Sequence, residues 1–140
     1  MSDATPEVTE TKEEPKPEEM LTKALAGFEG APKEDEIVAW KNKHGDIFCS
    51  GFSEQELFVW RPVTRHEFSG FQVEIAQAQQ QGLVVDVEEK IVKNCILWSS
   101  VKGNQSLSQK AGSLSTLHEQ IMQQSNFMDP RVAAALVIKL

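Results

Sequence analysis

The chain has 140 residues, of which 40% are hydrophobic, and a formal net charge of −7 at pH 7. This length allows one domain, and the negative charge disfavours nucleic acid and anionic membrane as partners, because both need clustered Lys and Arg side chains. The sequence contains no apolar run of about 18 residues and its acidic beginning is unlike a signal peptide, so we expect a cytoplasmic protein with no membrane partner.

Residues 1–33 are predicted to form an acidic, Pro-containing arm ahead of the domain. The first part of the arm holds acids, Thr, Pro and Lys and no aromatic residue, so we expect it to be disordered. Residues 20–28 then carry apolar side chains at helical spacing. A helix this short is marginal in isolation, so it either packs on its own domain or folds into a groove of a partner. In the second case the partner-binding residues are Met20, Leu21, Leu25 and Phe28.

A helix capped by Asp35 is predicted to open a single small domain over residues 34–140. Ile47 and Cys49 alternate with Phe48 and Ser50 in the period of a strand, and Leu57 to Trp60 is a short run rich in β-branched and aromatic residues. With a turn between them, the two runs predict an antiparallel hairpin. Because a two-stranded hairpin is marginal alone, the helices that follow must cover its apolar face.

The corner from Arg61 to Glu67 is predicted to turn the chain from a strand into a helix. Pro62 ends the strand, and Thr64 and Glu67 have the Thr-x-x-Glu spacing of a capping box. We expect both to have structural roles. The helix that follows should end near Gly82, and one apolar stripe runs along it, formed by Phe68, Phe71, Ile75 and Ala78.

A second acidic cap, formed by Asp86 with Glu89, predicts a helix that runs through Trp98. Apolar residues recur every three or four positions along this segment, so we expect Trp98 in the core beside Phe71 and Val92. Residues 99–113 are then predicted to be a long polar loop, either mobile or ordered by a partner.

The last part of the chain is predicted to hold two helices. Thr116 and Glu119 repeat the capping-box spacing and should start a helix that ends near Asn126. Asp129 before Pro130 should start a second helix that continues to residue 140. This terminal helix either completes the core or contacts a second copy or another partner, through apolar residues that include Val132, Leu136 and Leu140.

The elements together predict a mostly helical α+β fold, with a hairpin packed against four to five short helices. No motif in it indicates catalysis: Cys49 and Cys95 lie in apolar runs without metal-ligand spacing, and no serine has a nucleophile-elbow motif. The prominent carboxylates have capping positions. We therefore expect neither an enzyme nor a cofactor or metal site.

Three motifs stand in a fixed order between residues 35 and 128: the corner Arg61-Pro62-Val63-Thr64-Arg65-x-Glu67, the segment Cys95-Ile-Leu-Trp98, and the stretch from Ala111 to Phe127. In these motifs and their order, the chain resembles small proteins of tailed bacteriophages that are described as tail assembly chaperones or minor virion proteins. Two features depart from the pattern. Ser99 and Ser100 stand where it has a proline, and the acidic arm is not part of it.

The resemblance implies a protein of the host cell cytoplasm that binds other phage proteins during tail morphogenesis, namely tape-measure or tail-tube subunits, without chemical turnover. The alternative that it implies is a structural component of the virion, in the baseplate, tail or capsid. In that alternative the N-terminal arm and the terminal helix lock onto neighbouring subunits.

Overall fold

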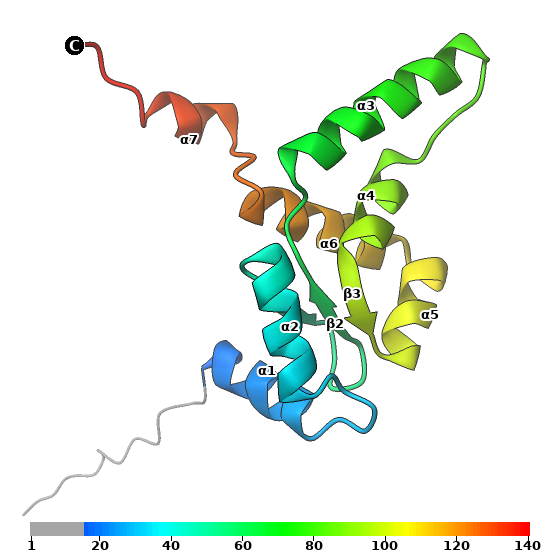
Figure 1. Cartoon of the computed structure of the whole chain (residues 1–140), viewed down its shortest axis with the longest axis vertical. Helices are drawn as coiled ribbons and strands as arrows, with labels where there is room; N and C mark the ends of the chain where they lie inside the picture. The colour runs from blue at the N-terminus through cyan, green and yellow to red at the C-terminus, as the bar shows by residue number, and fades with distance from the viewer. Residues whose placement is uncertain (1–15) are drawn as a thin grey trace, which may run out of the picture.

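The computed structural model describes residues 16–140, and these residues form a three-stranded antiparallel sheet and seven helices (Figure 1). This confirms the predicted α+β class. Residues 1–15, which hold most of the predicted disordered arm, lie outside the described residues. The strands are β1 (Phe48–Gly51), β2 (Leu57–Trp60) and β3 (Ile96–Ser99), in the order β1-β2-β3. The helices are α1 (Pro17–Ala26), α2 (Glu34–His44), α3 (Arg65–Gln80), α4 (Val87–Cys95), α5 (Val101–Gln109), α6 (Ala111–Gln124) and α7 (Pro130–Ala134).

The central strand β2 is buried on both faces, and its side chains alternate between two helical layers. Phe58 and Trp60 belong to the main core on the side of α4 and α6. Leu57 and Val59 face the other side, where α1 and α2 lie (Figure 1). The predicted hairpin is confirmed as the β1-β2 pair. The rest of the main core comes from the corner, α4 and α6: Val63, Ile91, Val92, Cys95, Leu117 and Ile121.

The predicted helix through Trp98 is wrong in its last turn, because α4 ends at Cys95 and the chain continues as β3. Trp98 pairs with Val59 across the β2-β3 ladder. The second edge of β2 would otherwise bury unpaired backbone N–H and C=O groups, and Ile96 to Ser99 satisfy them. Trp98 therefore does not lie beside Phe71 and Val92. Its ring is half-buried and contacts Phe28 edge-on, with ring centroids 5.9 Å apart.

The predicted loop over residues 99–113 is helical instead. Ser100 caps α5, and its Oγ accepts hydrogen bonds from Gly103 N and Leu57 N, both at 3.0 Å. The hydroxyl groups of Ser106 and Ser113 hydrogen-bond each other at 2.6 Å in the interior between α5 and α6. These buried hydrogen bonds stabilise a polar segment as helix. Because α6 already begins at Ala111, the predicted cap at Thr116 and Glu119 is also wrong.

Of the predicted caps at Thr64, Asp86 and Asp35, the first two are confirmed and the third is not. Thr64 Oγ1 accepts from Glu67 N while Glu67 Oε1 accepts from Thr64 N, which is the predicted capping box. Asp86 Oδ1 accepts from Glu89 N at the start of α4. Asp35, by contrast, lies inside the first turn of α2, which begins at Glu34.

Gly103 brings the start of α5 close to β2, and a side chain at this position is expected to destabilise the fold. A Cβ atom added there would lie 2.9 Å from Ser100 Oγ and 3.1 Å from Leu57 O. Gly→Ala within a helix usually stabilises by about 1 kcal/mol, but we expect Gly103→Ala to lower the free energy of unfolding by about 1–3 kcal/mol. Urea denaturation measures this. Gly112→Ala is the control, because its Cβ would meet nothing within 4 Å. Equal stabilities of the two variants would contradict the close approach.

Candidate protein-binding surfaces

The described part of the chain contains no activated thiol and no cluster of metal-binding side chains. Burial raises the pKa of the Cys95 thiol to about 11, and it also raises the pKa of Cys49. Both thiols are therefore protonated at neutral pH, whereas nucleophilic attack and metal binding need the thiolate. Between residues 16 and 140, no three His, Cys, Asp or Glu side chains are close enough together to hold a metal ion.

The strand-to-helix corner contains a partly buried ion pair between Arg61 and Glu67. Arg61 Nη1 and Nη2 donate to the two carboxylate oxygens of Glu67, each at 2.7 Å. Arg61 Nη2 also donates to Asn94 O at 3.2 Å, and Asn94 Nδ2 donates to Glu67. The hydrogen bonds from Arg61 are the largest cause of the low pKa of Glu67, which falls to about 2. The pair thus joins β2, α3 and α4. Sequence reasoning identified Thr64 and Glu67 but missed Arg61, whose only signal was its place before Pro62.

The C-terminal segment, residues 127–140, projects from the body of the domain (Figure 1). The predicted terminal helix starts as expected, since Asp129 Oδ1 accepts from Arg131 N and Pro130 is the first helical residue, but it ends at Ala134. The segment does not complete the core. Its large apolar side chains are exposed: Val132 (55%), Leu136 (68%), Val137 (76%), Ile138 (79%) and Leu140 (fully).

The base of the C-terminal segment is fixed to the domain. The Phe127 and Phe68 rings are in contact, with centroids 5.0 Å apart. Ser125 Oγ, just before the segment, accepts from Val63 N at 2.9 Å and donates to Ile121 O at 2.6 Å. The segment therefore leaves the domain from a defined point, between α6 and the corner.

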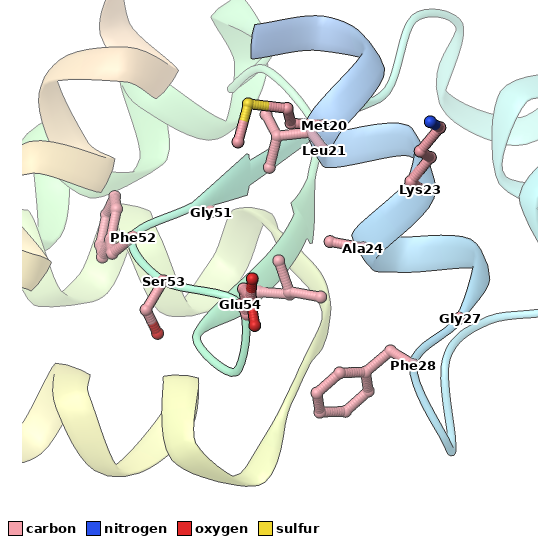
Figure 2. A pocket seen from close by; sticks show the side chains of 11 residues that line it. Met20, Leu21, Lys23, Ala24, Gly27, Phe28, Gly51, Phe52, Ser53 and Glu54 are labelled. Atoms are coloured by element: carbon pink, nitrogen blue, oxygen red, sulfur yellow. The ribbon is translucent and has the colours of Figure 1, made fainter. Parts of the chain in front are cut away.

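Helix α1 forms a second apolar surface, on the face of the sheet opposite the main core. Of the two alternatives that the sequence leaves open, the structure shows the first: the helix packs on its own domain. Leu21 lies against Gly51, and Phe28 contacts Trp98. Leu21, Leu25 and Phe28 are half-buried, while Met20 remains 59% exposed. A groove of about 800 Å³ lies on each side of the helix; Figure 2 shows the one towards Phe52 and Glu54.

Exposed apolar side chains also occur on and just after α3, which projects from the body of the domain (Figure 1). They are Val73 on the helix and Leu83 and Val84 just after it. Lys90 on α4 forms an ion pair with Glu74 and so links α3 to α4. These three side chains are scattered, in contrast to the five clustered within nine residues of the C-terminal segment.

No family model matches the chain, and neither a curated protein nor a solved structure matches it. None of the helices within residues 16–140 is long and apolar enough to cross a membrane. The two apolar surfaces and the sequence motifs are therefore the basis for assigning a function.

Proposed function

We propose that this is a non-enzymatic bacteriophage protein that acts in tail morphogenesis as an assembly chaperone and binds tape-measure or tail-tube subunits. The observation that carries the proposal is the exposed apolar C-terminal segment. Contiguous exposed apolar side chains on a folded domain mark sites of protein association. The assignment to phage tails rests on the resemblance of residues 35–128 to small phage proteins.

The C-terminal segment is suited to fold further on a partner. Val132, Leu136 and Leu140 are spaced by four residues, so extending α7 to residue 140 would place them along one face of a helix. The first turn is already capped and started by Asp129 and Pro130, which removes the cost of nucleation. A hydrophobic groove on a tail subunit would complete the helix and bury its apolar face.

Serine at Val132, Leu136 and Leu140 is expected to abolish partner binding while leaving the domain folded. The three side chains are exposed, so their loss should change the free energy of unfolding by less than about 0.5 kcal/mol each. The chain is coexpressed with the tape-measure or tail-tube subunit of the same phage, and complexes are separated by size-exclusion chromatography.

The matched control replaces Val73, Leu83 and Val84 by serine, which removes as many exposed apolar side chains at another place. We expect this variant to keep the complex. If both triple variants bind the subunits as the unchanged chain does, the C-terminal segment is not the binding element. Absence of any complex with either subunit contradicts the proposed role itself.

A further inference from the structure

We infer that two copies of this chain associate by strand addition, in which residues 136–140 of one copy pair with the free edge of β1 in a second copy. The added strand runs antiparallel to β1 and so continues the order of the sheet. This interaction goes beyond the proposed function and does not rest on it, because it involves no phage subunit. It gives the apolar C-terminal segment a partner when no tail subunit is bound.

Strand β1 lies at one edge of the sheet and has backbone groups that point outward. Leu57 O accepts a hydrogen bond from Ser100 N, so the odd-numbered residues of β2 bond towards β3. The β1-β2 register therefore turns the N–H and C=O groups of Cys49 and Gly51 away from β2. Within residues 16–140 these four groups have no hydrogen-bond partner. They form a ready template for one more strand.

The edge of β1 lacks the features that usually prevent pairing between sheet edges. Exposed edge strands are commonly protected by charged side chains, by proline or by a bulge. The four residues of β1 are Phe, Cys, Ser and Gly, and their register with β2 is regular. Gly51 is exposed and has no side chain, so another backbone can approach it closely. The edge is therefore open to an extended segment.

The grooves beside α1 place the added strand at β1 and not at β3. Gly51 lines the groove in Figure 2, and Cys49 lines the groove on the other side of the helix, each of about 800 Å³. Side chains of an added strand that lie opposite Cys49 and Gly51 point to the same face of the sheet as these two residues do. Two alternate apolar side chains of the added strand would therefore enter the two grooves.

Residues 136–140 have the sequence and the conformation of an unpaired strand. Val137 and Ile138 are β-branched, which favours strand geometry. In a strand, Leu136, Ile138 and Leu140 share one face, because side chains alternate between the two faces. Helix α7 ends at Ala134, and within the described residues the backbone of residues 138–140 forms no hydrogen bond. The segment therefore has both the free backbone groups and the apolar face that strand addition needs.

Charge and direction favour a second copy as the source of the segment. The chain has a net charge of −7, whereas the charged side chains of residues 130–140 are Arg131 and Lys139, both positive. The lining of the two grooves holds three acids and two lysines: Glu18, Glu34, Glu54, Lys23 and Lys33. A basic segment is attracted to an acidic domain. Because the segment points away from the sheet of its own domain, that domain is the one of another copy (Figure 1).

Sedimentation velocity of the full chain tests the association itself. We expect the mass of the unchanged chain to rise with concentration, and to rise beyond a dimer because the contact joins two different surfaces. Ile138→Ser should weaken the association at least about tenfold, since this side chain enters a groove. Val137→Ser is the matched control: its side chain is 76% exposed, against 79% for Ile138, but lies on the other face of the strand. An unchanged chain that stays monomeric, or equal effects of the two variants, would overturn the inference.

Synthetic peptides of residues 130–140 distinguish strand addition from docking of a helix. N-methylation removes one backbone donor and leaves the side chain unchanged. In the added strand, Ile138 N–H bonds to β1 and Lys139 N–H points away. Methylation at Ile138 should therefore weaken binding to the full chain at least about tenfold, and methylation at Lys139 should leave it nearly unchanged, in fluorescence anisotropy. Loss of binding with both peptides, which a helix would give, or with neither, would overturn the inference.

Amide hydrogen exchange followed by NMR locates the binding site of the unmethylated peptide. The peptide should slow exchange of the Cys49 and Gly51 amides and leave exchange of the β3 amides unchanged. Protection of β3, or of neither strand, would overturn the inference. Protection of β1 in the monomeric chain at every concentration would assign the edge to the segment of the same molecule, and would overturn the second copy. These experiments use no phage subunit, so their failure is distinguishable from failure of the proposed chaperone role.

Discussion

Replacing Phe58 by alanine is expected to lower the free energy of unfolding by about 3–5 kcal/mol. Phe58 is fully buried in the centre of β2 and its ring contacts that of Phe52, with centroids 5.3 Å apart. Gly103 at the start of α5 also lies close to this ring, so the cavity left by alanine would open between the sheet and a helix. A small domain has only about 5–15 kcal/mol of stability, so the loss would be a large fraction of the total.

Urea denaturation followed by circular dichroism measures the effect of Phe58→Ala. Phe127→Ala is the matched control, because the same ring is removed from a side chain that is 44% exposed. We expect the control to lose about 1 kcal/mol. Similar losses in the two variants would contradict the position of Phe58 at the centre of the fold.

Replacing Arg61 by methionine is expected to lower the free energy of unfolding by about 2–4 kcal/mol, because it leaves the Glu67 carboxylate partly buried without its main partner. The side chains of Arg61 and Glu67 are only 11% and 24% exposed. Arg61→Met combined with Glu67→Gln should recover part of the loss, since no unpaired charge then remains. The two residues would not be coupled if the loss in the double variant equalled the sum of the losses in Arg61→Met and Glu67→Gln measured separately.

The same ion pair gives the fold a dependence on acid. The pKa of Glu67 is lowered from 4.5 to about 2 in the folded protein, so the folded state prefers the charged carboxylate. Its contribution is fully present above pH 4.5 and is lost as the pH falls towards about 2. Glu67→Gln should therefore show a smaller loss of stability between these pH values than the unchanged protein, in denaturation experiments at constant ionic strength.

The elements that the sequence predicted well are those whose signals are local. The hairpin follows from two short strand-like runs, Ile47 to Ser50 and Leu57 to Trp60, with a turn between them. The corner follows from Pro62, Thr64 and Glu67 within a few residues. In each case the residues that determine the backbone conformation lie within the element itself.

The elements that the sequence did not predict depend on distant residues. Ile96 to Ser99 continue the helical pattern of α4, and they become a strand because β2 offers an unpaired edge. Helix α5 is stabilised by Ser100, whose hydroxyl binds Leu57 N and Gln55 O from the hairpin. The apolar end of the chain is exposed rather than part of the core, and a helix of its length is marginal alone.

The sequence identified the apolar residues of the candidate surfaces but not all of their positions in the fold. Val132, Leu136 and Leu140 were predicted as apolar contact positions, and they are exposed on the projecting C-terminal segment. The sequence could not decide whether Leu21 and Phe28 contact the domain, because their partners Gly51 and Trp98 depend on the strand register. Binding of tail subunits by either surface stays a prediction.

Quantitative mass spectrometry of purified virions and of infected cells tests most directly whether the protein is an assembly chaperone. We expect the protein to be present in infected cells, in complexes with tape-measure or tail-tube subunits, and to be absent from purified particles. Its presence in the particles at a fixed copy number would contradict this account and would identify it as a structural component of the virion.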